Sequence, residues 1–304
     1  MTSALEHACE DFLTYLRDVR QLSPHTLDNY RRDLASLCTH CLSQGRDDPA
    51  RLLEADIRHW VSQMHRRGLA GSSIQRSLSA VRSLFNYLGR SQAQRHNPAA
   101  AVQAPRRPRK LPKTLDADQV DRYLRFAGDD PITRRDRAMA ELFYSSGLRL
   151  AELTAANLQD LDRHSRLLTV TGKGRKTRTV PVGAPALQAL ERWLEVREPD
   201  EGDDDAQRAL FLSHRGTRIS RRNVQDRLRR QGRASGMLQD VHPHMLRHSF
   251  ASHMLESSGD LRAVQELLGH ANISTTQIYT HLDFQHLAKV YDSAHPRAKR
   301  RKRD

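Results

Sequence analysis

The chain has 304 residues, of which 38% are hydrophobic and 28% charged, and its formal net charge at pH 7 is +14. This composition excludes an intrinsically disordered chain, and no apolar run approaches the roughly 20 residues that a membrane-spanning helix needs. The length suits two domains, and the excess of positive charge points to a polyanionic partner.

The N-terminus and the cysteine content indicate the compartment. Glu6, Glu10 and Asp11 lie within a helical pattern, which is unlike the profile of a secretory signal peptide. Three cysteines in the whole chain are typical of a reducing compartment, so we expect a cytoplasmic protein without membrane insertion. Cys38 and Cys41 have the C-x-x-C spacing but lack the βαβ context of a redox motif. We therefore expect neither a redox nor a metal role for them.

The first hundred residues contain a series of helical patterns. Apolar positions recur at helical spacing in residues 4–20, 24–42, 55–67 and 72–88. Ser23 followed by Pro24 is a strong helix start, and Ser72 with Gln75 forms a candidate capping box. Helices with such short connections predict a small bundle.

A basic, proline-rich segment separates this bundle from the rest of the chain. Residues 97–113 contain four prolines and five basic residues, which favours an extended linker. All five basic residues fall in 106–113, so we expect a domain at 1–105, a linker at 106–113 and a second domain at 114–304. Basic side chains between two globular parts suit contacts with a nucleic-acid backbone. The candidates for these contacts are Arg106, Arg107 and Lys110.

The last eight residues form a basic tail. Residues 297–304 hold six basic residues against one acidic residue. For this segment alone, a solvated and disordered tail is the favoured interpretation.

The second domain is expected to begin with helices over 117–127 and 133–146, the latter ending at Gly147. Arg149 and Glu152 follow, three residues apart at the start of another helix. Taken alone, this spacing is equally compatible with an exposed helical ion pair that contributes little to stability.

Residues 167–182 predict a β-hairpin. Leu167–Thr171 and Thr177–Val182 have strand-like sequences and flank a Gly172-Lys173-Gly174 turn. The turn does not match the G-x-x-x-x-G-K-[ST] phosphate loop. Lys173 is either an ordinary solvated turn residue or a mobile lysine that reaches a phosphate, because its flanking glycines permit close backbone approach.

An acidic stretch and an arginine-rich helix come next. Residues 198–205 predict a solvated surface loop, and Ser220 predicts the N-cap of a helix. Five arginines crowd the polar part of that helix: Arg221, Arg222, Arg227, Arg229 and Arg230. A solvated face is one interpretation, but a helix that faces a groove or phosphates is favoured. Arg221 and Arg222 are its first candidate contacts.

Two further helices are expected near the C-terminus. His244 and Arg247 lie three residues apart in a helical pattern and should project from one face. Asp260 can cap a second helix, 261–268. Its expected core stripe consists of Leu261, Val264, Leu267 and Leu268. His270 follows the end of that helix, and Tyr279 lies nine residues beyond His270.

Two histidines, an arginine and a tyrosine suit phosphoryl transfer better than the chemistry of a serine or cysteine hydrolase. Such a hydrolase needs a serine or cysteine nucleophile beside a base, and no candidate for one is evident. Arginine donates to two phosphate oxygens, histidine shuttles protons, and a phenol can be a covalent nucleophile. With a reference pKa of about 10, tyrosine needs a base and a strongly positive pocket. His244 and His248 are four apart, but no acidic residue accompanies them as H-E-x-x-H would require, so we expect no zinc site.

H-x-x-R, then L-G-H, then Tyr279 resembles the signature of the tyrosine recombinase (phage integrase) family. The segments LSPHTLDNYRRDL and SSIQRSLSAVRSLFNYL resemble its core-binding domain. The resemblance implies a mainly α fold: a helical-bundle domain that clamps DNA, and an α-rich catalytic domain with a small antiparallel sheet. The C-terminal segment is similar to that of family members that resolve chromosome dimers; it reads LLGHANISTTQIYTHLDFQHLAKVYDSAHPRAKR.

The resemblance also implies a site and a reaction. Tyr279 would attack a DNA phosphate and form a 3′-phosphotyrosyl link, with strands exchanged through a Holliday junction and with no metal, ATP or other cofactor. Matching the family motif residue by residue gives the catalytic set Arg149, Lys173, His244, Arg247, His270 and Tyr279. Arg149 and Arg247 would hold the non-bridging oxygens, with Glu152 orienting Arg149, His244 as base and Lys173 as acid.

The implied partners are double-stranded DNA, a paralogous recombinase in a heterotetramer on two DNA sites, and a septal DNA translocase. A final helix over 281–295 would dock on a neighbouring subunit. Three alternatives stay open: a type IB topoisomerase, a mobile-element integrase, and a non-catalytic nucleoid protein. The first shares the chemistry, while the last explains the charge but not the six matched positions.

Overall fold

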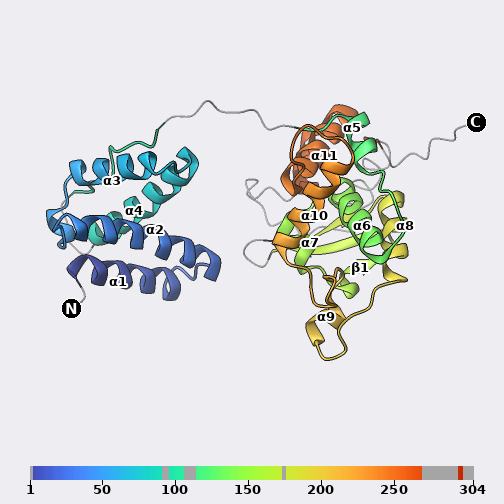
Figure 1. Cartoon of the computed structure of the whole chain (residues 1–304), viewed down its shortest axis with the longest axis horizontal. Helices are drawn as coiled ribbons and strands as arrows, with labels where there is room; N and C mark the ends of the chain where they lie inside the picture. Colours follow the sequence, from blue (N-terminus) through green and yellow to red (C-terminus); the bar gives the residue numbers. More distant parts are fainter. Residues whose placement is uncertain (1–2, 91–95, 106–113, 173–175, 269–293, 297–304) are drawn as a thin grey trace, which may run out of the picture. The chain divides into compact units, whose positions relative to one another are not determined.

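The computed structural model describes residues 3–90, 96–105, 114–172, 176–268 and 294–296. The chain divides into two compact units, Met1–Lys110 and Leu111–Asp304, called here the N-terminal and C-terminal units (Figure 1). None of the helices within the described ranges is both long and apolar enough to cross a membrane.

The N-terminal unit is a helical bundle. Its α-helices are α1 (Ala4–Asp18), α2 (Pro24–Ser43), α3 (Glu54–Arg66) and α4 (Gly71–Arg90), with a 3-10 turn at Pro49–Arg51. As the sequence predicts, Ser23 caps α2 by accepting from the Thr26 amide, and Pro24 occupies its first turn. The apolar faces of the helices meet in a core that includes Phe12, Trp60 and Phe85.

Two expectations for this unit are wrong. The helix α4 begins at Gly71, so Ser72 lies inside it and does not cap it. Composition favours an extended segment from residue 97, but residues 97–104, which lie within the domain expected at 1–105, pack on the bundle, with Ala99 and Val102 buried in its core. Arg82 of α4 donates to the backbone carbonyls of both residues, and this fixes the segment on the bundle.

The cysteines of this unit are all free thiols. The Sγ atoms of Cys9 on α1 and Cys38 on α2 lie 3.5 Å apart, across the contact of these two helices. Burial raises the pKa of the Cys41 thiol to about 12.

The C-terminal unit is built around the helix α6 (Pro131–Ser146). Asp130 caps its start, and every residue from Ala138 to Ser146 is buried. Packed on or near α6 are α5 (Ala117–Tyr123), α7 (Leu150–Ala155), α8 (Ala184–Leu194), α10 (Arg221–Ala234), α11 (Pro243–Ser258) and α12 (Leu261–Leu268) (Figure 1). The shared core contains Phe143, Leu190, Phe211 and Phe250.

A small antiparallel sheet completes this unit. Its order is β1 (Leu161–Asp162), β2 (Leu167–Thr171) and β3 (Thr177–Pro181), with Leu168 opposite Val180 in the register. The hairpin of β2 and β3 confirms the sequence prediction, whereas β1 was not expected. The mainly helical fold with a small antiparallel sheet is therefore the one that the sequence predicts.

Three details of this unit differ from the sequence expectations. The helix α5 ends at Tyr123, four residues early. Within the acidic stretch, Asp204 opens a short helix, α9 (Asp204–Arg208), and Asp205 of this helix pairs with Arg218. Leu261 was expected in the core stripe of α12 but is 54% exposed, and Ala263 is buried beside Val264 in its place.

Candidate active site

The end of α6 and the start of α7 place Arg149. Gly147 terminates α6 with φ +58°, in the left-handed region that glycine adopts without strain. Arg149 is then the N-cap residue of α7, and Glu152 in the first turn accepts from the Arg149 amide at 2.7 Å. The Arg149 side chain donates from Nη1 to Glu152 Oε1 at 2.8 Å and is 37% exposed.

Glu152 is not the exposed partner that a surface ion pair would have. Its side chain is only 1% exposed, and it is shared with a second arginine, Arg178 of β3. Burial opposes ionisation of Glu152, but hydrogen bonds from Arg178 and Arg149 outweigh this effect and hold its pKa below the usual range. The sequence pattern does not single out Arg178. Its only signal was a basic residue in an otherwise apolar and hydroxylated strand.

Arg247 lies on α11 and is buried, with 7% of its surface exposed. It donates from Nη2 to the carbonyl of Leu268 at 2.6 Å, and from Nη1 to the carbonyl of Gly147. Burial, together with the nearby charges of Arg149 and Arg178, lowers the pKa of Arg247 to about 10. The guanidinium therefore stays protonated at neutral pH.

His244 lies one turn before Arg247 on the same helix and is exposed. Partial burial lowers the pKa of its imidazole, and the charges of His248, Arg247 and Arg149 lower it further. His242 caps α11 by accepting from the Met245 amide at 3.1 Å. Arg149 and Arg247 are therefore both near enough to His244 for their positive charges to lower the pKa of its imidazole.

The hairpin approaches this site at Gly172, the last described residue before Lys173. A Cβ atom added to Gly172 would lie 3.4 Å from Glu152 Oε1 and 3.9 Å from Arg149 Nη1. The amide of Gly172 donates to the carbonyl of Lys176 at 2.8 Å and closes the base of the turn. The residue that precedes Lys173 in the chain therefore lies beside the Arg149–Glu152 pair, where an added methyl group would touch it.

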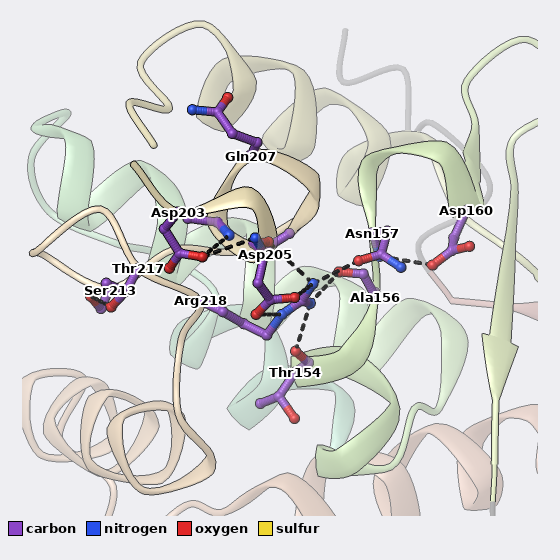
Figure 2. A network of polar contacts seen from close by, with 12 residues as sticks. Thr154, Ala156, Asn157, Asp160, Asp203, Asp205, Gln207, Ser213, Thr217 and Arg218 are labelled. Atoms are coloured by element: carbon purple, nitrogen blue, oxygen red, sulfur yellow. Dashed lines mark hydrogen bonds and ion pairs between the residues drawn. The ribbon is translucent and has the colours of Figure 1, made fainter. Parts of the chain in front are cut away.

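The C-terminal end of α7 is held by a second network (Figure 2). Arg218 donates to the backbone carbonyls of Thr154 and Ala156, and its Nη2 donates to Asn157 Oδ1 at 2.7 Å. The same guanidinium pairs with Asp205 of α9 at 2.8 Å. Both ends of the six-residue helix behind Arg149 are therefore fixed by arginine side chains.

The arginines of α10 divide into two groups. Arg221 and Arg222 lie in the first turn and are exposed, as a DNA contact would require. Arg227 instead pairs with the buried Asp136, and Arg229 with Asp226 at 2.9 Å. Arg230, the fifth arginine of the expected phosphate-facing set, is exposed like Arg221 and Arg222. Arg227 and Arg229 are engaged in ion pairs within the unit.

Several predicted site residues lie outside the described residues. These are Lys173, His270 and Tyr279 of the catalytic set, and Arg106, Arg107 and Lys110 of the linker. Within the ranges that the structure describes, no group of three or more His, Cys, Asp or Glu side chains is arranged to hold a metal ion.

Comparison with known proteins identifies the family. Residues 113–286 match the phage integrase family, and residues 9–92 match the N-terminal SAM-like domain of phage integrases. The chain therefore belongs to the phage integrase family and is a tyrosine site-specific recombinase. Its sequence is 56% identical over 295 residues to tyrosine recombinase XerC of Xanthomonas campestris pv. campestris (strain B100), covering 97% of this chain and 90% of that protein.

Further relatives and solved structures agree with this family. Tyrosine recombinase XerC of Pseudomonas aeruginosa (strain PAO1) is 54% identical over 291 residues, covering 95% of each protein. The Tn1549 transposon integrase in complex with a circular intermediate DNA has the same fold, with a TM-score of 0.74 and 19% identity over 93% of this chain and 98% of that one. A lambda integrase dimer bound to a core site gives a TM-score of 0.70 and 20% identity, over 90% and 99% of the two chains.

Proposed function

We propose that the chain cleaves and rejoins DNA by transesterification through Tyr279. The phenol oxygen attacks a scissile phosphate, forming a 3′-phosphotyrosyl bond and releasing a 5′-hydroxyl. The ester conserves the energy of the broken phosphodiester, so a second strand can be joined without ATP. Two such exchanges through a Holliday junction recombine two duplexes.

The observation that supports this most is the charge of the site. Among the described residues, Arg149 and Arg178 both bond the carboxylate of Glu152, and their positive charges lower the pKa of the nearby Arg247. This leaves an excess of two positive charges where a pentavalent phosphorane would develop negative charge. Preorganised donors of this kind typically contribute about 3–4 kcal/mol each to transition-state stabilisation.

The division of roles follows from burial. The Arg149 side chain is 37% exposed and therefore accessible to a phosphate oxygen, whereas Arg247 is held by two backbone carbonyls. His244, with its lowered pKa, is neutral at pH 7 and suited to accept the Tyr279 proton. Lys173, which follows Gly172 at the ion pair, is the acid for the leaving 5′-oxygen, and His270 is a further donor.

The proposed DNA contacts lie on both sides of the domain boundary. Arg221 lines a surface groove together with Ala151 of α7, so the first turn of α10 borders the helix that Arg149 caps. Arg222 is its exposed neighbour, and the linker adds Arg106, Arg107 and Lys110. We infer that the domain at 1–105 and the domain at 114–304 close on the two sides of a duplex.

The biological role is proposed from the relatives at 53–56% identity, all of them named tyrosine recombinase XerC. On this basis the chain resolves chromosome dimers in the cytoplasm at a dif-type site, in a heterotetramer with a XerD-like recombinase, and a septal DNA translocase is a further partner. The transposon integrase at 19% identity supports the fold but not a mobile-element role.

The test uses a nicked suicide duplex that carries the chromosomal dif-type site, with and without a XerD-like protein. Covalent protein–DNA adduct in denaturing electrophoresis is expected for the wild type. Binding without an adduct would favour the nucleoid-protein alternative. Relaxation of any supercoiled plasmid by the single protein, without site preference, would favour a type IB topoisomerase.

A further inference from the structure

Arg178 links the segments that carry the proposed catalytic residues. Its two terminal nitrogens bond the two oxygens of Glu152, at 2.8 Å for Nη2 to Oε2. Its Nε donates to the carbonyl of Leu267 in the last turn of α12 at 3.4 Å. The side chain is 12% exposed.

Each contact lies next to a different part of the site. Glu152 also holds Arg149, and Arg178 itself stands on β3, the strand that follows the Lys173 turn. Leu267 is three residues before His270 in the chain. One guanidinium therefore connects the start of α7, the catalytic hairpin and the end of α12. A lysine could not replace it, because a single ammonium cannot donate along two parallel bonds to both carboxylate oxygens.

The charge balance gives Arg178 a second effect. Glu152 is buried. A buried carboxylate with a single cationic partner either stays ionised, so that the net charge of the pair is zero, or takes up a proton. With Arg178 present, the two arginines and one carboxylate keep one net positive charge. Without it, the Arg149–Glu152 pair is neutral.

We propose that Arg178 is a positioning residue for the strand-cleavage reaction. It acts through Glu152 to fix the guanidinium of Arg149, and it keeps the net charge around Glu152 positive for the DNA phosphate. This inference rests on the proposed function, since it assigns Arg178 a part in the same reaction. Arg178 does not contact DNA in this account; it sets the geometry and charge of the residue that does.

The test compares single-turnover cleavage of the suicide duplex across pH for the wild type, Arg178→Gln, Arg178→Lys and the charge-balanced double variant Glu152→Gln/Arg178→Gln. Arg178→Gln should cleave roughly 10- to 100-fold more slowly at neutral pH with little change in DNA affinity. Its rate should also fall on the acid side at a higher pH than for the wild type, because Glu152 then protonates more easily. The double variant has no such carboxyl and should not show this acid limb.

The matched control is Arg135→Gln. Arg135 is 2% exposed and, like Arg178, donates to one carboxylate, Asp136, and one backbone carbonyl, Leu212. Its loss should lower the melting temperature without changing the shape of the pH profile. If Arg178→Gln slows cleavage by a constant factor at every pH, as Arg135→Gln would, or leaves the rate unchanged, the positioning role is refuted.

Thermal melts without DNA test the same coupling independently of cleavage. In the wild type the lowered pKa of Glu152 means that its contribution to stability is present at high pH and is lost as pH falls. In Arg178→Gln the pKa is expected above that of the unfolded chain, so the sign reverses. Relative to the double variant, Arg178→Gln should lose stability as pH rises, and the absence of this reversal would overturn the inference.

These outcomes separate the two proposals. Absence of any adduct from the wild type would refute the proposed function, while the melts would still report whether Arg178 balances Glu152. If Arg178→Gln does not fold, Arg178→Lys decides the question. It should cleave roughly tenfold more slowly than the wild type at unchanged DNA affinity, and a wild-type rate would contradict the inference.

Discussion

Arg247 on α11 donates a hydrogen bond from Nη2 to the carbonyl oxygen of Leu268, the last residue of α12, at 2.6 Å. Its Nη1 donates to the carbonyl of Gly147, where α6 ends. A single buried guanidinium therefore bonds the C-terminal ends of two helices, whose unpaired carbonyls carry partial negative charge. These contacts fix the position of Arg247 through the backbone.

Substitution of Gly147 should disturb this arrangement. Gly147 has φ +58°, and a Cβ there would lie 2.5 Å from Phe250 Cδ1 and 3.1 Å from Leu268 Cδ2. Gly147→Ala should destabilise the C-terminal unit by about 2–4 kcal/mol, because left-handed strain adds to overpacking. It should also slow cleavage, because the carbonyl that holds Arg247 must move.

The matched control for that substitution is Gly259→Ala. Gly259 ends α11 with φ +64°, but a Cβ there meets nothing within 4 Å. It should cost only about 1 kcal/mol and leave cleavage unchanged. Denaturant unfolding of the two variants measures the difference, and equal losses would show that contact with Phe250 is unimportant.

Several helix boundaries and one ion pair of the site were predictable from local sequence. Helix starts at Ser23 and Ser220 and the stop at Gly147 depend on residues next to one another in the chain, and all three are confirmed. The Arg149–Glu152 pair was likewise visible as a three-residue spacing.

The remaining contacts depend on distant partners. Arg178 lies 26 residues from Glu152, and in an alternating strand nothing distinguishes a buried cation from an exposed one. The partners of Arg247 are backbone carbonyls, which leave no trace in the sequence. Ala99 and Val102 are small apolar residues between prolines, so their burial on α4 was hidden by a linker-like composition.

His244 gives a prediction about pH. Burial and the neighbouring positive charges lower the pKa of its imidazole below the ordinary value of 6.5. The stability that neutral His244 contributes should be complete above that ordinary value and should be lost as pH falls through the lowered one. NMR titration, assigned with His244→Gln, should give a midpoint below 6.5 in DNA-free protein. A midpoint above that value would contradict the positive field ascribed to Arg149 and Arg247.

The role of Lys173 as acid can be separated from that of a phosphate contact. Lys173→Ala should cleave slowly, but a substrate with a 5′-bridging sulfur should restore its rate to near that of the wild type, because a thiolate leaves without protonation. Arg149→Ala should show little rescue, since it acts on non-bridging oxygens. If Lys173→Ala stays as impaired as Arg149→Ala on the sulfur substrate, Lys173 is an electrostatic contact and His270 becomes the first candidate acid.

The C-terminal end of the chain allows two truncations with different expected effects. Ala294 and His295 are buried in the C-terminal unit, where the His295 ring packs on Tyr144 and Phe250. Deleting 294–304 should therefore destabilise this unit by about 1–3 kcal/mol. Deleting only 297–304 should leave the melting temperature unchanged but weaken DNA binding and flatten its salt dependence, because six basic residues are lost.

A third truncation bears on subunit docking. If residues 281–295 dock on a neighbouring subunit, truncation after Thr280, which removes the whole segment, should abolish cooperative binding to a two-site duplex in band-shift assays. Lower stability with unchanged cooperativity would show that the segment serves its own unit alone.

The most direct measurement of the central claim is covalent trapping by the wild type and Tyr279→Phe on the same nicked suicide duplex. Phenylalanine keeps the ring and removes only the nucleophilic oxygen. We expect a protease-sensitive protein–DNA adduct with the wild type, formed also in EDTA because arginines balance the phosphate charge, and none with Tyr279→Phe at equal DNA affinity. An adduct in Tyr279→Phe would assign the nucleophile to another residue, and a wild type that binds the duplex without forming any adduct would contradict the account.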